Sequence, residues 1–445
     1  MINKIIGLIC LTATFNLFAS DIKFDKTKAF IKIKKGESLP TSNFIKSSKH
    51  LFGQNYLVVT QDVLKLEADL KANSTIERIE RNYYAEKEAL PKMENTKSLD
   101  PELYFGAFND PKVGQIWSFL DDSDNGISIN KSYLSPLSTT KVEVIVAVVD
   151  TGVDYNHEDL KDVMWKNTAE IEGNNIDDDN NGYIDDIFGI DPLSGDTDPM
   201  ASHAHGTHVA GTIAAKQNNN IGIAGIAGSA KIMAIRTVPD RSDETDADVV
   251  ESFLYAGKNG ARVLNCSFGK KHNEGGMIVN ETIDFIGTEY GALVVAAAGN
   301  DHKKDIDKDL VYPASFQSNH LMVVASTTKR GKLSSFSNVG LKNVDVAAPG
   351  SGIFSTVPGN SYSSMSGTSM ASPTTAGVVA EIMSNFPELN GESVKEILIN
   401  SVTKVNKFDR YMVSGGRVDL FKALQYTLEN YIEIIENQNQ NQNQK

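Results

Sequence analysis

The spacing of apolar residues divides the chain into two parts with different predicted folds. Between residues 21 and 97, short alternating segments such as Phe30–Lys34 and Tyr56–Thr60 are typical of strands with one buried face. A helical pattern over Val63–Ala72 and a third alternating segment at Ile76–Glu80 follow. The sequence therefore predicts a small α+β domain at this end of the chain.

From about residue 140 the pattern changes to nearly continuous apolar runs with helical segments between them. These runs occupy Val142–Val149, Lys231–Thr237, Val263–Ser267, Leu293–Ala298 and Leu321–Ser326. Strands that are buried on both faces and alternate with helices indicate a parallel β-sheet with helices on each side. We therefore predict an α/β fold for residues 140–430. Ligands bind beyond the carboxyl ends of such strands, where Asp150, Ser267 and Asn300 stand.

Three flanking segments lack these patterns. Residues 98–139 are predicted to be a linker and the start of the mature chain, and the Asn/Gln-rich residues 431–445 to be a disordered tail. Residues 1–20 contain Lys4 followed by the mostly apolar run Ile5–Ala19, which is typical of a signal peptide. We expect a secreted or periplasmic protein without a membrane span after signal removal. An uncleaved N-terminal anchor is the alternative.

Charge is distributed unevenly along the chain. The net charge of −14 argues against binding to nucleic acid or to an anionic membrane. Residues 21–100 hold 15 Lys and Arg against 12 Asp and Glu, whereas residues 101–445 carry a net charge of −18. Opposite charges are expected of two parts that dock on each other. Loss of Cys10 with the signal peptide would leave Cys266 as the remaining thiol, so we expect no internal disulfide.

Three strings contain residue types that acyl transfer requires. Asp150 begins Asp-Thr-Gly-Val-Asp after a buried strand, where a carboxylate needs a partner such as an imidazole N–H. The alternative interpretation is that Asp150 is a turn residue at the end of the strand. His205 begins His-Gly-Thr-His-Val-Ala-Gly-Thr, whose small residues allow a helix to start close to its neighbours. His208 would suggest zinc, but neither HExxH nor a Cys cluster accompanies it. Ser369, in Gly-Thr-Ser-Met-Ala-Ser-Pro, suits either a helix cap or a nucleophile.

In this order, the three strings resemble those of the subtilases, the subtilisin-like serine proteases. The resemblance covers about residues 110–425. It implies that Ser369 attacks a carbonyl carbon, His205 carries the proton and Asp150 orients the imidazole. It also implies that Asn300 donates a hydrogen bond to the oxyanion. The implied protein is a monomeric serine endopeptidase acting on peptide or protein substrates.

The resemblance extends to substrate-binding segments and to the N-terminal domain. The implied substrate-binding residues are Ser267, Phe268, Gly269, Tyr312, Pro313 and Ala314. The acidic stretch Pro239–Asp248 departs from the Gly-rich stretch of many relatives, which leaves the subsite preference open. Residues 21–97 resemble a subtilase propeptide, with Glu77–Tyr83 similar to its final strand. The resemblance implies a folding assistant and inhibitor, which we expect to be removed by self-cleavage within residues 88–110.

Two loops are candidates for structural calcium, which prefers oxygen ligands from loops. The resemblance implies one site with ligands from Asp159, Gln217, Asn219, Ile221 and Ile223. In the second loop, Asp177, Asp179 and Asn181 before Gly182 have the spacing of the first half of an EF-hand loop. Phe188 stands where that motif requires Glu, so a solvated acidic loop is the alternative.

Two other functions remain open. A catalytically silent relative would lack a triad residue or the oxyanion donor, and none of these is missing from the strings. A sedolisin-type hydrolase would pair a Glu with the serine, which fits the strings around Asp150 and His205 poorly.

Overall fold

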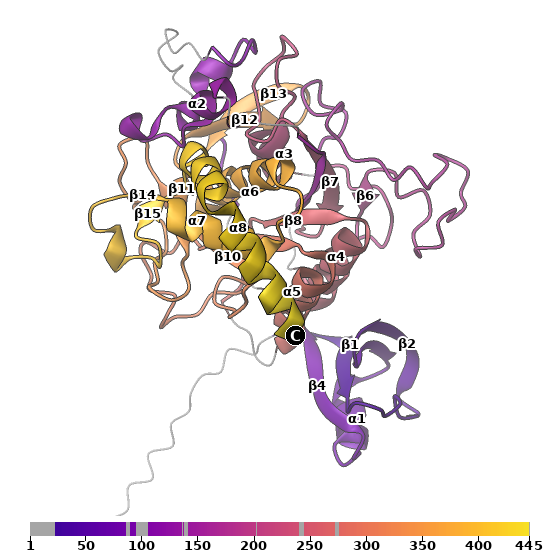
Figure 1. The fold of residues 1–445 in the computed structure, drawn as a ribbon. Coiled ribbons are helices and arrows are strands. Elements are labelled where there is room, and N and C mark those ends of the chain that lie inside the picture. The colour runs from indigo at the N-terminus through magenta and orange to yellow at the C-terminus, as the bar shows by residue number, and fades with distance from the viewer. Residues whose placement is uncertain are drawn as a thin grey trace, which may run out of the picture.

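The computed structural model describes residues 23–85, 90–94, 106–135, 137, 141–201, 203–239, 244–271 and 276–444. These form a small N-terminal domain and a larger body (Figure 1). The small domain is an antiparallel sheet in the order β2-β3-β1-β4 with one helix. Its elements are β1 (Phe24–Ile33), β2 (Ile45–Phe52), β3 (Asn55–Thr60), α1 (Val63–Leu70) and β4 (Ile76–Tyr83).

The small domain has a core of its own. Helix α1 begins after Asp62, whose side chain accepts hydrogen bonds from two first-turn N–H groups. Val63, Leu66 and Leu70 then pack with Ile31 of the sheet. Strand β2 was not predicted, because it lies at the sheet edge with most of its residues exposed and therefore has no alternating pattern.

The body contains a nine-stranded sheet in the order β14-β15-β11-β10-β9-β8-β5-β7-β6. All neighbouring pairs described in this sheet are parallel except β14–β15. The predicted α/β fold is confirmed. Its strands are β5 (Val144–Asp150), β6 (Gly189–Ile190), β7 (Ala230–Arg236), β8 (Ala261–Cys266), β9 (Leu293–Ala297), β10 (Leu321–Thr327), β11 (Val346–Pro349), β14 (Thr403–Lys404) and β15 (Gly416–Arg417); β12 (Ile353–Val357) and β13 (Ser361–Met365) form a separate hairpin.

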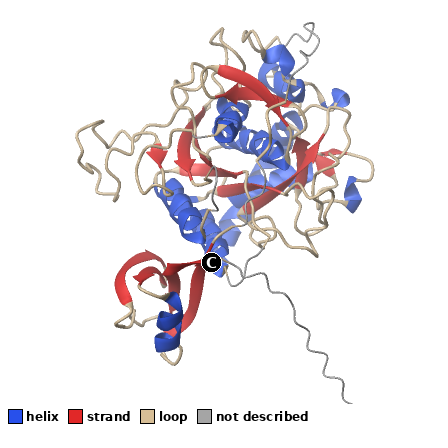
Figure 2. Cartoon of the chain, turned by 180° about the vertical axis from the view of Figure 1, so that it is seen from behind, coloured by secondary structure: helices blue, strands red, loops and turns tan. Residues whose placement is uncertain are grey.

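Helices cover both faces of this sheet (Figure 2). Val146 and Val148 of β5 contribute to one core with α3, α6, α7 and α8, whereas Ala147 and Val149 face a second core with α4 and α5. This alternation is what a strand buried on both faces requires. The helices are α3 (Ala204–Ala214), α4 (Asp246–Lys258), α5 (Met277–Tyr290), α6 (Thr368–Asn385), α7 (Gly391–Ser401) and α8 (Leu420–Gln444). No helix in the described ranges combines the length and apolarity needed to cross a membrane.

Part of the segment predicted as a linker belongs to the body. From Gly106 it forms short 3-10 turns and α2 (Ile129–Leu134). Trp117, Phe119 and Ile127 are buried in the core beside α3 and α6. The segment is therefore held in place by its apolar side chains.

The prediction of a disordered tail over residues 431–445 is wrong for residues 431–444, which continue α8. Ile434 and Ile435 pack against the main core. Gln438 is buried, and its Oε1 accepts hydrogen bonds from Asn390 N at 2.8 Å and Ser393 Oγ at 2.9 Å. These contacts hold α8 against the start of α7. Composition does not reveal such contacts, which is why it led to the prediction of disorder.

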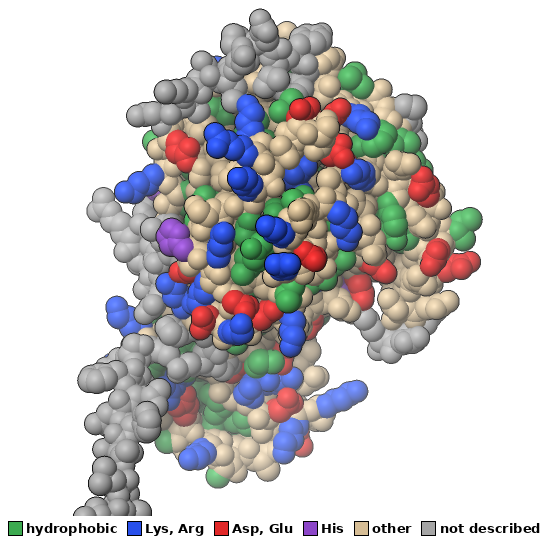
Figure 3. Space-filling model, turned by 90° about the vertical axis from the view of Figure 1, so that its left-hand side faces the viewer, with side chains coloured by type: hydrophobic (Ala, Val, Ile, Leu, Met, Phe, Trp, Pro, Cys, Tyr) green, Lys and Arg blue, Asp and Glu red, His purple; other side chains and the backbone are tan. Residues whose placement is uncertain are grey.

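The small domain docks on α4 and α5 of the body. Glu80 and Asn82 accept hydrogen bonds from first-turn N–H groups of α5 and α4, respectively. Glu281 of α5 lies 3.1 Å from Lys32 Nζ and 3.0 Å from Arg78 Nη2. These ion pairs join the basic and acidic parts of the chain. Figure 3 shows Lys and Arg spread over both the body and the small domain below it, interspersed with acidic residues.

Candidate active site

Asp150 and His205 meet at the carboxyl end of the sheet. Asp150 is the last residue of β5, and His205 lies in the first turn of α3. The distance between Asp150 Oδ1 and His205 Nδ1 is 2.7 Å, and both side chains are buried. Oδ1 also accepts a hydrogen bond from Thr151 N at 2.8 Å. The arrangement gives a buried carboxylate the imidazole partner that its burial requires.

Glycine allows α3 to start this close to β5. A Cβ added to Gly206 would lie 2.1 Å from Gly152 O and 3.2 Å from Asp150 Oδ1. Gly152 itself has a φ of +84°, a backbone conformation that residues with side chains rarely adopt. The small residues in the two strings therefore determine the distance between Asp150 and His205.

His208 is oriented differently from His205. It is fully buried, and its Nε2 contacts Ile353 O at 2.9 Å. Burial lowers the pKa of His208 to about 3, so its imidazole is neutral and donates to that carbonyl. The acidic cluster that the described ranges offer as a metal site contains neither histidine. Zinc binding by the pair therefore gains no support.

Ser369 lies in the first turn of α6 beside Ser267. Its Oγ donates to Ser267 O at 3.2 Å, and Ser267 Oγ donates to Ser369 O at 2.9 Å. Among the described residues, His205 Nε2 has no hydrogen-bond partner. The imidazole of His205 thus contacts Asp150 through Nδ1, and its other ring nitrogen, Nε2, is the one without a partner.

Asn300 follows β9 and is held by Thr368, a residue that the sequence analysis did not single out. Asn300 Oδ1 accepts hydrogen bonds from Thr368 N at 2.9 Å and Thr368 Oγ1 at 3.0 Å. With its oxygen engaged in this way, the amide has Nδ2 as its donor group. Thr368 directly precedes Ser369, so the amide of Asn300 is positioned beside the serine.

Ser369, Thr368 and Asn300 border a cleft. Its lining includes Ser267, Phe268, Gly269, Asn300, Thr368 and Ser369. Tyr312 and Pro313 border a neighbouring cavity with Phe268, and Ala314 is buried. Val311, next to Tyr312, lines the first cleft. It directly precedes the predicted substrate-binding residues Tyr312, Pro313 and Ala314.

The chain itself enters this cleft from the small domain. Ala85 N donates to Glu244 O at 2.8 Å, and Tyr84 pairs with Thr245 in an antiparallel bridge. Farther along, Leu90 and Pro91 line the cleft beside Ser369. Glu94 N then donates to Ser364 O of β13 at 2.7 Å. Tyr84, Ala85 and Glu94 therefore pair with the backbone of the body, and Leu90 and Pro91 lie in the lining of the cleft.

Comparisons with known proteins agree with this geometry. A family model described as "Subtilase family" matches residues 141–415. The chain belongs to the subtilase family. This subtilase is 31% identical to Subtilisin-like protease 1 of Plasmodium berghei (strain Anka) over 83% of its own length and 60% of that protein. It is 35% identical to thermitase of Thermoactinomyces vulgaris, over 63% of its own length and 88% of that protein.

A solved structure shows the same fold. Fervidolysin from Fervidobacterium pennivorans, a keratinolytic enzyme related to subtilisin, superposes with a TM-score of 0.67 and 23% sequence identity. The match covers 90% of this subtilase and 61% of the fervidolysin chain. The subtilase thus spans about three fifths of the length of both fervidolysin and the Plasmodium protein.

The first predicted calcium loop contains a second carboxylate that the sequence analysis missed. Asp159 is fully buried, and its oxygens accept from Asn219 Nδ2 and Ile223 N at 2.9 Å each. Gln217 Nε2 donates to Gly225 O at 2.8 Å. Asp110, also buried, accepts from Asn219 N at 3.1 Å. Burial raises the pKa of both carboxyl groups, and the charge of Asp110 raises that of Asp159 further.

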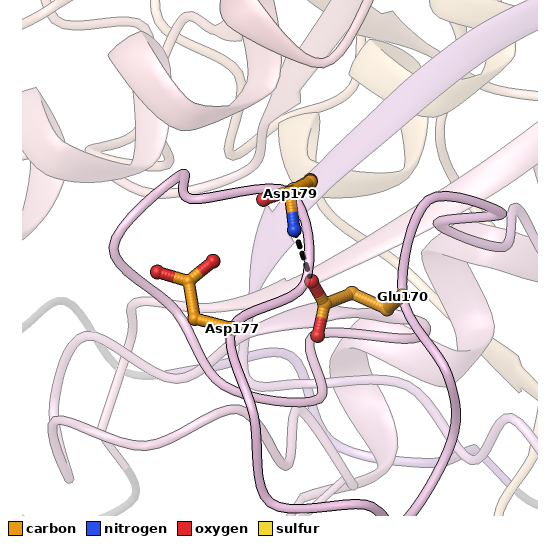
Figure 4. A group of neighbouring side chains, drawn as sticks. All are labelled: Glu170, Asp177 and Asp179. Carbon is orange, nitrogen blue, oxygen red and sulfur yellow. Dashed lines mark hydrogen bonds between the residues drawn. The ribbon is translucent and has the colours of Figure 1, made fainter.

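The second loop, residues 167–186, is called the acidic loop below. Carboxylate oxygens of Glu170, Asp177 and Asp179 lie within 4.8 Å of one another and could hold a metal ion (Figure 4). Glu170 was not predicted, because it stands outside the EF-hand-like spacing. Asn181, a predicted ligand, instead donates its amide to Asp179 Oδ2 at 3.0 Å and to Asp186 Oδ2 at 2.9 Å.

Proposed function

We propose that this subtilase is a serine endopeptidase that hydrolyses peptide bonds through an acyl-enzyme intermediate. The observation that carries the proposal is the 2.7 Å contact between Asp150 and His205. It is supported by a separate cleft that Ser369 and Asn300 line together. A nucleophile, a base, a residue that orients the base and an oxyanion donor are the groups that acyl transfer needs.

In the proposed reaction, Ser369 Oγ turns from Ser267 O towards His205 and attacks the scissile carbonyl carbon. His205 Nε2 takes the hydroxyl proton, while Asp150 holds the opposite nitrogen and stabilises the imidazolium. His205 then gives the proton to the leaving amine, and water hydrolyses the ester by the same route. The rotation of Ser369 is consistent with the tightening of catalytic hydrogen bonds when substrate binds.

The negative charge on the attacked oxygen needs donors that are already in place. Asn300 Nδ2 is one candidate, because Thr368 holds the amide by its oxygen. The backbone N–H of Ser369 in the first turn of α6 is the other, since N–H groups at a helix start have no partner within the helix. Both donors belong to residues that line the cleft, Asn300 and Ser369.

The proposed substrates are extended peptides. Tyr84 and Ala85 already pair with Thr245 and Glu244 as an added strand would, which supports this binding mode. Pairing through the backbone contributes affinity with little choice of sequence. Side-chain selection is assigned to the cleft walls at Phe268 and Val311.

The proposal includes a self-processed zymogen, with residues 21–97 as propeptide. The docking of the small domain on α4 and α5, and the position of Leu90 and Pro91 in the lining of the cleft, support it. Self-cleavage is placed within residues 88–110. After cleavage, the small domain would stay bound as an inhibitor until it is released or degraded.

Structural calcium is proposed at both loops. At the first loop, the carboxylates of Asp110 and Asp159 are both buried and repel each other, so a cation between them would be favourable. These two residues and Asn219 are the proposed ligands. At the second, Glu170, Asp177 and Asp179 would supply the oxygens. A bound ion would neutralise these charges and stabilise the fold, because it binds the folded state. None of the proposed chemical steps uses it.

Secretion is proposed from the N-terminal sequence. The predicted signal peptide, residues 1–20, lies outside the described residues. Its positive start and apolar run are the supporting observations.

A fluorophosphonate probe tests the activity directly. We expect the purified protein to be labelled and to cleave a peptide library, and Ser369→Ala to lose both properties. Labelling that persists in Ser369→Ala would contradict the assignment of the nucleophile. Absence of both labelling and peptidase activity in the mature wild-type protein would favour the catalytically silent alternative.

A further inference from the structure

Three segments that are distant in sequence meet at Glu251 of α4. Tyr183 of the acidic loop donates its hydroxyl to Glu251 Oε1 at 2.6 Å. Lys49 Nζ of β2, in the small domain, lies 3.3 Å from the same oxygen. Lys49 Nζ also lies 5.9 Å from the centre of the Tyr183 ring, within the range of a cation–π contact. The acidic loop and the small domain therefore share one partner and also contact each other.

The same segments line an open cavity of about 190 Å³. The small domain contributes Phe30, Leu51 and Leu57, and α4 contributes the opposite apolar wall. The acidic loop closes a third side with Asn181 and Tyr183. Displacement of this loop would open the cavity and expose apolar surface at the docked interface.

Tyr183 is held firmly within the body. Its ring packs edge-on against Tyr255 with centres 5.2 Å apart. Tyr255 in turn donates to Asp186 Oδ2, at the end of the acidic loop. The orientation of Glu251 towards Lys49 thus depends on the position of the acidic loop.

We propose that the acidic loop, through Tyr183, is a docking site for the chain's own small domain, in addition to the contacts on α5. The proposal rests on the assignment of that domain as a propeptide. Besides the hydrogen bonds of Glu80 and Asn82, two sets of ion pairs join the domain to the body. Glu281 of α5 binds Lys32 and Arg78. Glu251 of α4, which accepts the hydroxyl of Tyr183, binds Lys49. The second set makes retention of the cleaved domain depend on a loop that lies outside the substrate cleft.

The test uses the full chain with Ser369→Ala, so that docking is read independently of catalysis. A recognition sequence for an unrelated, site-specific protease is placed between residues 95 and 105. After that single cut, the rate at which the N-terminal piece leaves the body is measured on dilution. A failed peptidase assignment would leave this measurement unaffected, which separates the two proposals.

We expect Tyr183→Phe and Lys49→Ala each to speed release by about three- to tenfold, as expected for the loss of one charged hydrogen bond or ion pair. The double variant should release more slowly than the product of the two effects predicts, because both act through Glu251. The matched controls are Tyr155→Phe, which loses a hydroxyl contact to Asp198, and Lys65→Ala on α1. Both should release at the parent rate.

Two outcomes would overturn the proposal. One is release of Tyr183→Phe and Tyr183→Ala at the parent rate while both keep the parent thermal stability. The other is faster release in Glu251→Gln with no effect of either Tyr183 variant, which would assign docking to α4 alone.

Discussion

Asp150 and His205 lie 55 positions apart in the chain, and their side chains are 2.7 Å apart at the end of β5. The strand end and the helix start are brought together by glycines that permit close backbone approach. The contact leaves the opposite imidazole nitrogen of His205, Nε2, without a hydrogen-bond partner among the described residues. This relationship underlies the first prediction.

Ser369→Ala, His205→Ala and Asp150→Ala should each reduce kcat/KM on a peptide substrate by on the order of 10⁴- to 10⁶-fold. The losses should not add, because the three groups act as one unit. Steady-state kinetics on the single and triple variants measures this. Near-normal turnover by purified Ser369→Ala would refute the assignment.

Asn300→Ala should lower kcat by on the order of 10²- to 10³-fold with little change in KM, because its hydrogen bond forms only as the oxyanion develops. Thr368→Val should have a smaller effect of the same kind. It removes the hydroxyl contact to Asn300 Oδ1 but leaves the backbone N–H contact. If KM instead rose by a similar factor while kcat stayed unchanged, the result would indicate a role of Asn300 in ground-state binding.

His208 should make stability fall in acid. Burial lowers its pKa from 6.5 to about 3, so the unfolded chain binds a proton in this interval and the folded chain does not. This contribution is fully present above pH 6.5. It decreases as the pH falls towards 3, by up to about 1.4 kcal/mol per pH unit.

The His208 prediction is measured by urea unfolding of the Ser369→Ala chain at several pH values. His208→Gln should reduce the pH dependence in this interval by about one proton. An unchanged slope in that variant would assign the acid sensitivity to other groups, such as carboxylates.

Calcium removal by a chelator should lower the thermal stability and speed self-digestion. Asp177→Ala combined with Asp179→Ala should remove one bound ion, and Asp110→Asn should weaken a different one. Metal analysis of the purified proteins distinguishes the sites. The same calcium content in the wild type and the Asp177/Asp179 double variant would reject the acidic loop as a site, without bearing on Asp110 and Asp159.

Gln438→Ala should lower the free energy of unfolding by about 1–3 kcal/mol, because it leaves the buried polar groups of Asn390 and Ser393 without their partner. Gln440, which is exposed on the same helix, provides the matched control. Denaturant unfolding of Gln438→Ala and Gln440→Ala should differ accordingly. Equal stability of the two variants would show that this part of α8 does not contribute to the fold.

Several features could be predicted from the sequence because local chemistry determines them. The β-branched run before Asp150 predicts a buried strand wherever the strand lies in the sheet. The strings around Asp150, His205 and Ser369 carry the small residues that close approach requires, so the family and the candidate triad were recognisable without coordinates. These signals lie within windows of a few residues.

Other features depend on partners that are far away in the chain. Thr368 orients Asn300 across 68 positions, and Asp110 approaches Asn219 across 109. The Asn/Gln-rich end is helical because Ile434, Ile435 and Gln438 find partners on the body. Composition cannot reveal such partners, since their energy comes from burial and hydrogen bonding between segments.

The sequence by itself thus determined the alternating strands and helices, the family and the candidate triad, because these follow from residue type and short-range spacing. Only the tertiary structure decided which side chains contact the candidate residues, that Leu90 and Pro91 line the cleft and that Lys49, Tyr183 and Glu251 meet. Those relationships require the packing of segments whose separation along the chain leaves no local pattern.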